Sequence, residues 1–226
     1  MDLRIVSAGA AQSLVGAIAE RDAIRVSGVF GAVGAMLERF RDGDACDVVI
    51  LTHPQIESLI AGGRAFGPVV DLGTVPTAIA VREGEREPDV SSEKALRAAL
   101  LDADGIFFPD PSKSTAGIHF GKVLDRLGIR EKVEAKTKTF PNGATAMRAM
   151  ALSDGRALGC TQATEILATP GVRLVAALPS GFELETVYTA AVSATADDTD
   201  AAAAFVTSLG AAASRDLRSE AGFVLP

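Results

Sequence analysis

The segment PDPSKSTAG, residues 109–117, places a lysine and two hydroxyl residues where a short apolar strand gives way to a helix-type segment. Lys113 supplies a positive charge, and Ser114 and Thr115 supply hydroxyl groups. The first turn of a helix adds unpaired N–H groups at the positive end of the helix dipole. This combination favours binding of a negatively charged ligand. The alternative is a solvated loop lysine beside a serine that only caps the helix.

Four other segments have the same form, in which a strand ends in small residues and a helix begins. They are SAGAAQS (7–13), GAVG (31–34), LTHP (51–54) and CTQAT (160–164). In a parallel α/β sheet such junctions gather at the carboxyl ends of the strands, where ligands bind. We therefore expect an anion pocket, although SAGA and GAVG also suit plain packing of a helix on a sheet. The candidate ligand-binding residues are Ser7, Ala8, Gln12, Ser13, Gly31, Ala32, Val33, His53, Lys113, Ser114, Thr115, Ala116, Thr161 and Gln162.

His53 is the candidate catalytic residue because it stands where a strand ends and a helix begins. At that position a histidine can cap the helix, bind an anion when protonated, or act as a general base near neutral pH. His119 lies one turn inside its helix, so we expect a structural role for it. Glu165 is expected to complement the dipole of its own helix from the first turn.

Several kinds of catalytic or cofactor site find no support in the motifs. No GxGxxG follows the first strand, and GAVGAM lacks the GK[ST] of a phosphate-binding loop. GxSxG and HExxH are also missing, which argues against a covalent hydrolase and a zinc peptidase. Cys46 and Cys160 match no zinc spacing, so we expect two small buried thiols, no metal site and no cofactor.

The composition of the chain argues against nucleic acids and membranes as binding partners. The formal net charge of −7, the absence of Trp and the single Tyr argue against a nucleic-acid surface. No stretch approaches the roughly 18–20 continuous apolar residues of a membrane span, so no membrane insertion is expected. The start MDLRIVSAGA shows no signal peptide. The sequence as written therefore indicates a cytoplasmic protein, or a periplasmic one if a signal was removed.

Hydrophobic periodicity predicts an α/β fold, with short apolar strands alternating with amphipathic helices. A second unit is expected to begin after Val75-Pro76. The expected strands are 3–8, 23–30, 47–52, 77–81, 105–108, 136–140, 157–162, 172–178 and 186–194, and the expected helices are 12–21, 31–40, 53–61, 91–104, 115–128, 143–152, 163–167 and 198–213.

Five segments together resemble the molybdate-binding group of the two-lobed periplasmic solute-binding proteins. They are SAGAAQSLVGAIA, VFGAVGAMLERFRDGDACDVVILT, DPSKSTAGIHFGKVLDRLGI, NGATAMRAMALSDGRALGCTQATEI and SEAGF. The resemblance implies a type II periplasmic-binding-protein fold, in which each lobe is a mostly parallel sheet flanked by helices. Lobe I would combine 1–76 with 190–226, lobe II would be 80–186, and strands near 77–81 and 186–192 would form the hinge. In such proteins hinge closure buries the ligand between the lobes.

The resemblance also implies positions for ligand contacts. The first serine of the family falls on Ser13, or on Ala11 if no residue is inserted, and a backbone donor falls on Thr115 and Ala116. The second serine falls on Val33, and the tyrosine of the family is replaced near Thr161. The loss of two hydroxyl donors argues against tetrahedral molybdate and leaves another anion as the expected ligand.

Two functions follow from these observations. In the first, the chain binds a small anion, an organic carboxylate or an oxyanion, and an exported form would serve an ABC permease. The alternative follows from a related, aconitate-isomerase-like branch, which shifts a proton between two carbons of a small unsaturated tricarboxylate without a cofactor. In that case Lys113, Ser114 and Thr115 would hold carboxylates and His53 would carry the proton.

Overall fold

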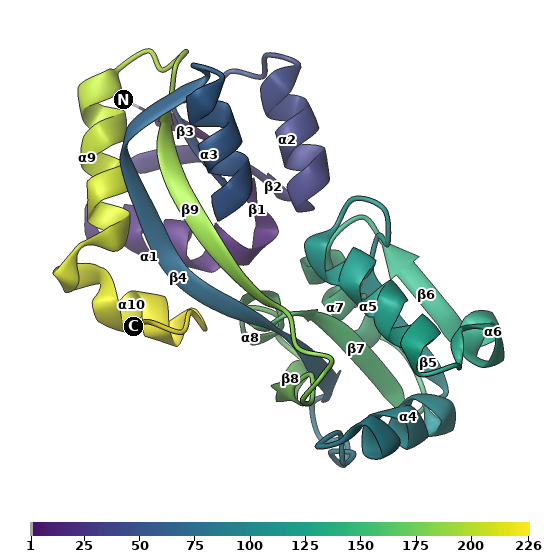
Figure 1. Cartoon of the computed structure of the whole chain (residues 1–226). Coiled ribbons are helices and arrows are strands. Elements are labelled where there is room, and N and C mark those ends of the chain that lie inside the picture. Colours follow the sequence, from purple (N-terminus) through teal and green to yellow (C-terminus); the bar gives the residue numbers. More distant parts are fainter. Residues whose placement is uncertain (1) are drawn as a thin grey trace. The chain divides into compact units, whose positions relative to one another are not determined.

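The computed structural model describes residues 2–226, which divide into two units of strands and helices (Figure 1). Unit 1 contains the chain up to Val75 together with Thr186–Pro226, and unit 2 contains Pro76–Glu185. Strand β4 (Ala65–Arg82) extends from unit 1 into unit 2, and β9 (Glu185–Ser193) begins where the chain returns to unit 1. The predicted α/β class is therefore confirmed, while a hinge role for these two strands stays a prediction.

The sheet of unit 1 has three parallel strands, β1 (Asp2–Ala8), β2 (Arg25–Gly31) and β3 (Val48–Thr52), with β9 antiparallel to β3. Ala8 pairs with Gly31 and Ser7 with Ile50, so the carboxyl ends of the parallel strands meet at one edge. Figure 1 shows α2 and α3 on one side of this sheet, and α1 and α9 on the other. The helices of unit 1 are α1 (Gln12–Arg21), α2 (Val33–Arg41), α3 (His53–Ala61), α9 (Thr199–Gly210) and α10 (Arg215–Glu220).

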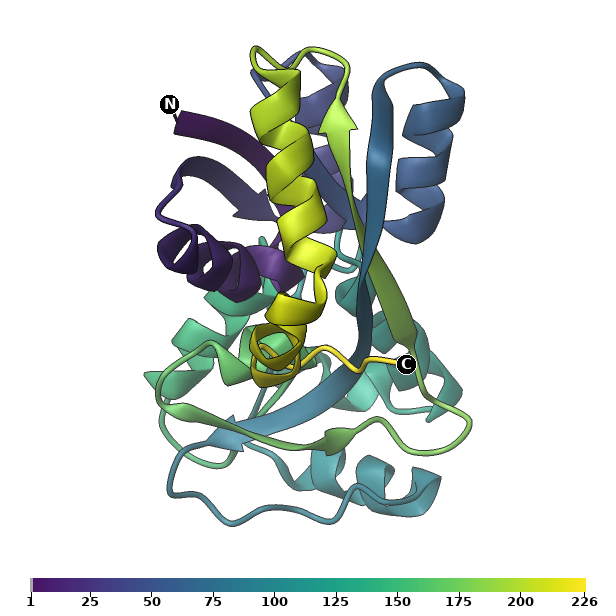
Figure 2. The same cartoon turned by 90° about the vertical axis from the view of Figure 1, so that its left-hand side faces the viewer.

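Helix α9 runs beside β4 in both views of the chain (Figures 1 and 2). Asp198 caps it by accepting a hydrogen bond from the N–H of Ala201 at 2.9 Å. The helix buries Phe205 and Leu209 against the sheet, and its small alanines allow a close approach. An alanine-rich composition thus serves packing here.

A buried carboxylate stabilises the far edge of this sheet. Asp47, only 3% exposed, accepts hydrogen bonds from the backbone N–H of Arg4 (2.8 Å), from its guanidinium (3.0 and 2.6 Å), and from the N–H of Asp197 (2.9 Å). The Arg4 side chain holds the pKa of Asp47 down at about 2. Asp47 therefore joins β1 to the segment that leads into α9.

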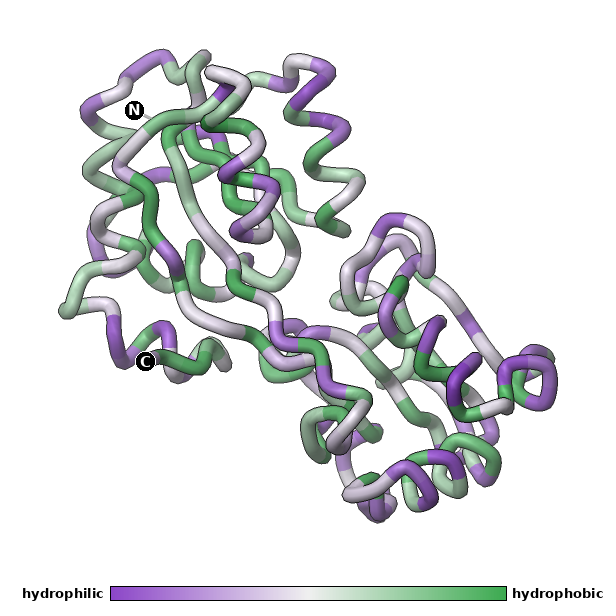
Figure 3. The backbone as a smooth tube through the Cα atoms, viewed as in Figure 1, coloured by the Kyte–Doolittle hydropathy of each residue, from purple (hydrophilic) through white to green (hydrophobic). Residues whose placement is uncertain are grey.

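The sheet of unit 2 has the strand order β8-β4-β7-β5-β6, with β5 parallel to both of its neighbours and β4 antiparallel to β7 and β8. Figure 3 shows hydrophobic residues along these strands and alternating colours along the helices. The strands are β5 (Gly105–Pro109), β6 (Thr137–Phe140), β7 (Ala157–Gln162) and β8 (Val172–Ala177), and the helices are α4 (Glu93–Asp102), α5 (Thr115–Arg126), α6 (Arg130–Val133), α7 (Gly143–Ala151) and α8 (Ala163–Leu167).

Alternation along β7 assigns the helices to the two faces of this sheet. Leu158 and Cys160 belong to a buried cluster with Phe120 of α5 and Leu96 of α4. The intervening Gly159 instead lies against the methionines of α7. The expected buried state of Cys160 and Cys46 is confirmed, since both are fully buried and reduced.

Two expectations differ from the structure. The strand expected at 77–81 is the end of β4, which begins at Ala65, because Gly67, Pro68 and Pro76 interrupt the apolar pattern that would reveal the earlier part. Helices α6 and α10 were missed because four and six residues are too few to show a helical period. Among the described residues 2–226, no helix has the length and apolar composition of a membrane span.

Candidate functional site

Unit 1 brings three helix starts together at the carboxyl edge of its parallel strands. Ala8 leads through a short 3₁₀ turn (Gly9–Ala11) into α1, and Ala32 leads into α2. Within the described residues, neither start has a side-chain cap. The first N–H of α1, on Gln12, donates to the carbonyl of Gly9, whereas the first N–H groups of α2 have no partner inside their helix. Helix α3 differs because Thr52 and Gln55 bond to each other across its first turn (Oγ1 to Oε1, 2.9 Å).

The candidate ligand-binding residues of unit 1 lie at this edge of the sheet but differ in exposure to solvent. Ser7 and Ala8 are buried, and the Ser7 hydroxyl already donates to the carbonyl of Ala8 at 2.9 Å. Gly31, Ala32 and Val33 are also buried, so this junction can offer a ligand its backbone but no hydroxyl. Gln12 is exposed and Ser13 half-buried at the start of α1.

His53, the predicted catalytic residue, is held by carboxylates within unit 1. Its Nδ1 lies 2.9 Å from Oδ1 of Asp71 and 3.2 Å from Oγ1 of Thr189, and Nε2 lies 3.4 Å from Oε1 of Glu57. The hydrogen bond with Asp71 raises the pKa of His53 above its ordinary value. The arrangement therefore shifts the imidazole toward its protonated form, which can donate a proton or bind an anion.

The loop between β5 and α5 contains a carboxylate of its own. The carboxylate of Asp110 accepts from the N–H and the hydroxyl of Ser112 (2.7 and 2.6 Å) and from the N–H of Lys113 (3.3 Å). The Ser112 hydroxyl holds the pKa of Asp110 below its usual range. The loop amides are thus already used, and Lys113 is exposed at the tip of a turn that Asp110 shapes.

Ser114 caps α5, since its Oγ accepts from the N–H of Gly117 at 3.4 Å. Thr115 and Ala116 form the first turn that follows, where backbone N–H groups have no partner inside the helix. This is the position at which an external anion would meet α5. His119 has the structural role expected, because its Nε2 bonds to the carbonyl of Phe182 at 2.7 Å.

Thr161 and Gln162 end β7 beside a buried carboxylate that the sequence does not reveal as a site residue. The Thr161 hydroxyl donates to Oε2 of Glu165 at 2.5 Å, and Thr161 is fully buried. The backbone N–H groups of Gln162, Gly143 and Ala144 also donate to this carboxylate. Glu165 therefore serves the start of α7 as well as that of its own helix.

Two of the residues that shape these junctions, and one contact of a third, could not be predicted from the sequence. Asp71 and Thr189 hold His53 from β4 and β9, and no local pattern connects positions so far apart in the chain. Glu165 carries a local signal, since it lies three residues after the N-cap of α8, where a glutamate reaches back to the N-cap amide. Its contact with α7 is visible only in three dimensions.

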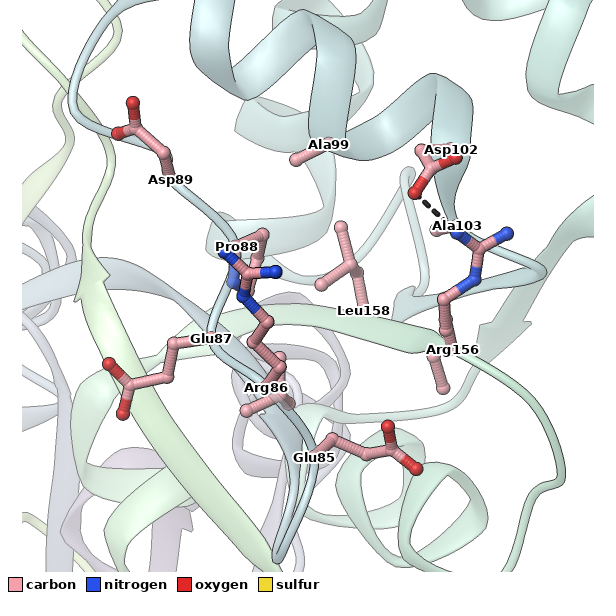
Figure 4. Close-up of a pocket in the computed structure, with 12 residues that line it drawn as sticks. Glu85, Arg86, Glu87, Pro88, Asp89, Ala99, Asp102, Ala103, Arg156 and Leu158 are labelled. Carbon is pink, nitrogen blue, oxygen red and sulfur yellow. Dashed lines mark hydrogen bonds and ion pairs between the residues drawn. The ribbon is translucent and has the colours of Figure 1, made fainter.

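A pocket of about 350 Å³ lies elsewhere in unit 2, where β5 and β7 begin rather than end (Figure 4). Figure 4 shows Arg156 paired with Asp102, at 2.5 Å between Nη1 and Oδ2. The charged residues that line this pocket are Glu85, Arg86, Glu87, Asp89, Asp102 and Arg156. The surplus of carboxylates makes this pocket unsuitable for an anion.

Metal chemistry finds no donor set in the described part of the chain. Across residues 2–226, no group of three or more His, Cys, Asp or Glu side chains is arranged to hold a metal ion. The junctions instead offer backbone amides, hydroxyl groups, one lysine and one histidine, all of which suit an anionic ligand.

Comparisons with known proteins agree on the family and on the fold. The family model described as "Bacterial extracellular solute-binding protein" matches residues 3–224. The periplasmic molybdate-binding protein of Azotobacter vinelandii has the same fold, with 18% identity, a TM-score of 0.77 and 99% of each chain covered. The sulfate-binding protein of Mycobacterium tuberculosis is similar in the same way, with 19% identity, a TM-score of 0.71, and 99% of this chain and 86% of that chain covered.

A curated relative in sequence is an aconitate isomerase from a Pseudomonas species, 29% identical over 174 residues. The match covers 76% of this chain and only 64% of that protein's own length. The molybdate-binding and sulfate-binding proteins have the type II periplasmic-binding-protein fold, so the expected fold family is confirmed.

Proposed function

The chain belongs to the family of bacterial extracellular solute-binding proteins, and on this basis we propose that it binds a small anion, an organic carboxylate or another oxyanion, at its strand-to-helix junctions. The observation that carries the proposal is the uncapped start of α2, where Gly31, Ala32 and Val33 bring bare backbone to the carboxyl edge of the sheet. First-turn amides of this kind bind carboxylates and oxyanions through hydrogen bonds and the helix dipole.

Unit 2 has donors of the same kind. Thr115 and Ala116 offer first-turn amides of α5, and Lys113 adds a positive charge at the preceding turn. The structural neighbours described as molybdate- and sulfate-binding proteins lend support to an anionic ligand. An exported form would deliver the ligand to the permease of an ABC importer.

A proline at position 33 tests the α2 junction with little damage to the helix. Val33 is the first residue of α2 and Ala32 before it is extended (φ −59°, ψ 138°), so Val33→Pro removes only an N–H that the helix does not use. We expect this variant to bind citrate, aconitate or sulfate at least about tenfold more weakly, since a hydrogen bond to a charged group contributes about 1.5–3 kcal/mol.

A matched control is Glu93→Pro, which also places proline first in a helix after an extended serine, at α4. For the lysine, Lys113→Gln is compared with Lys122→Gln, an exposed lysine within α5. Calorimetric titration of all four variants would reject the proposed site if both members of each pair weakened binding equally.

A second function is favoured by the aconitate isomerase relative and by the His53 cluster. In this alternative the chain shifts a proton within a small unsaturated tricarboxylate, with His53 moving the proton and Asp71 orienting its ring. Proton NMR in D₂O tests it, because isomerisation through a proton shift exchanges deuterium into the substrate. Aconitate that binds without isomerisation or exchange would leave binding alone as the function, and a His53→Ala variant with full turnover would exclude His53 as the proton carrier.

A further inference from the structure

The first turn of α7 is filled by a carboxylate of the chain itself. The N–H groups of Gly143 and Ala144 donate to Glu165, and the next N–H, that of Thr145, donates to Oδ1 of Asn142 at 2.9 Å. The donors at the first three positions of this nine-residue helix are therefore all used by side-chain oxygens.

The surroundings are fitted to that carboxylate. Thr161 adds its hydroxyl at 2.5 Å, and Glu165 is only 7% exposed. A Cβ on Gly143 would overlap both Oε2 of Glu165 and Oγ1 of Thr161, so a glycine is required for the carboxylate to reach the helix. Small backbone, first-turn amides and a hydroxyl are the same features that elsewhere in the chain would receive an external anion.

We propose that Glu165 is a specificity-determining residue: its carboxylate occupies the anion-binding start of α7 and so excludes an inorganic oxyanion from it. The inference rests on the proposed function, anion binding at the strand-to-helix junctions, and it narrows the ligand to organic carboxylates. Glu165 would thus influence which ligand binds although it contacts the chain's own amides and a hydroxyl group.

Two physical effects produce the exclusion. The amides and the Thr161 hydroxyl have no capacity left for a second acceptor, because each N–H or O–H donates one hydrogen bond. A negative charge fixed at the helix start also repels another anion, and such repulsion is strong in a site of 7% exposure. A tetrahedral dianion needs many donors around one centre, so it loses more from the filled helix start than an organic acid that binds through a single carboxylate at another helix start.

Glu165 is buried among hydrogen-bond donors. Removal from water raises the pKa of this carboxyl above its usual value. The hydrogen bonds from Thr161, Ala144, Gln162 and Gly143 work in the opposite direction. The buried Glu165 carboxylate therefore accepts from four donors of the chain and occupies the place where an external anion would bind.

The test measures binding of sodium sulfate, sodium molybdate and citrate by calorimetry to the wild-type chain and to three variants. Glu165→Ala empties the site, Glu165→Gln keeps its shape without the charge, and Glu131→Gln removes an exposed carboxylate of unit 2 as the control. We expect sulfate and molybdate to bind at least tenfold more tightly to Glu165→Ala than to the wild type, with a smaller gain for Glu165→Gln and none for Glu131→Gln. Citrate affinity should change less than threefold.

Anomalous scattering from molybdate in crystals of Glu165→Ala then locates the ion. A peak beside the amides of Gly143 and Ala144 supports the proposal, and a peak elsewhere overturns it. Wild-type chain that binds sulfate as tightly as Glu165→Ala also overturns it, while citrate binding to both would leave the proposed function standing. If the wild type binds none of the anions but Glu165→Ala binds molybdate at α7, the inference holds and the proposed function fails. If Glu165→Ala does not fold, Glu165→Gln decides, and no gain in that variant counts against the proposal.

Discussion

Replacing Gly143 by alanine should destabilise the protein, although alanine is normally the better helix residue. A Cβ at this position overlaps Oε2 of Glu165 and Oγ1 of Thr161, so the carboxylate must leave the amides of α7. Each hydrogen bond to a charged group contributes about 1.5–3 kcal/mol, against a gain of about 1 kcal/mol from replacing a helical glycine. If two such bonds are weakened, the free energy of unfolding falls by about 2 kcal/mol, or about 4–8 °C in Tm for a chain of this size.

Gly16→Ala is the matched control because it makes the same change inside α1. A Cβ there would meet no atom of residues 2–226 within 4 Å, apart from its own helix backbone and chain neighbours. This variant should be stabilised by about 0.5–1 kcal/mol, so the two substitutions are expected to have opposite signs.

Urea unfolding followed by circular dichroism measures both changes, alone and in a Glu165→Ala background. With Glu165 removed, the cost of Gly143→Ala should fall by at least about 1 kcal/mol, since the two residues are in contact. A Gly143→Ala variant as stable as the wild type, together with a stabilised Gly16→Ala, would refute the placement of Glu165 against α7.

Two further predictions concern buried or paired charges. Asp47→Asn should lower the free energy of unfolding by about 2 kcal/mol, because a pKa of about 2 in place of 3.8 corresponds to a preference of about that size for the ionised form. The difference between wild type and variant should be full above pH 4 and shrink as the pH falls toward 2, and an equal difference in Tm at pH 7 and pH 2.5 would contradict this origin. Asp71→Asn should remove a smaller contribution, below about 1 kcal/mol because the His53 side chain is 40% exposed. Since Asp71 raises the pKa of His53, that contribution is present below pH 6.5 and lost as the pH rises further, so Tm differences that grow toward pH 9 would refute it.

Most of the fold could be predicted because each unit follows local rules. Alternation of strand and helix patterns gave α1 (Gln12–Arg21), β7 (Ala157–Gln162) and α8 (Ala163–Leu167) at their observed bounds. The caps Asn142 of α7 and Asp198 of α9 also follow a local rule, because a cap acts within four residues of its own helix.

The candidate site was harder to predict because its decisive contacts are not local. Sequence reasoning correctly placed the junctions at helix starts, but it treated Thr161 as a donor to the ligand. In the structure the Thr161 hydroxyl donates to Glu165, and the first-turn amides of α7 do the same. Likewise the hydrogen bond that raises the pKa of His53 comes from Asp71, which is distant in sequence. Spacing along the chain cannot reveal which donors the protein already satisfies with its own carboxylates.

An NMR titration of the wild-type chain with citrate and aconitate tests the central claim most directly. We expect saturable shifts of the amide signals of Val33 and Gly34 in α2 and of Thr115 and Ala116 in α5, with little change at Gly143 and Ala144. No saturable shift with either carboxylate or with sulfate, or shifts confined to residues away from these helix starts, would contradict it.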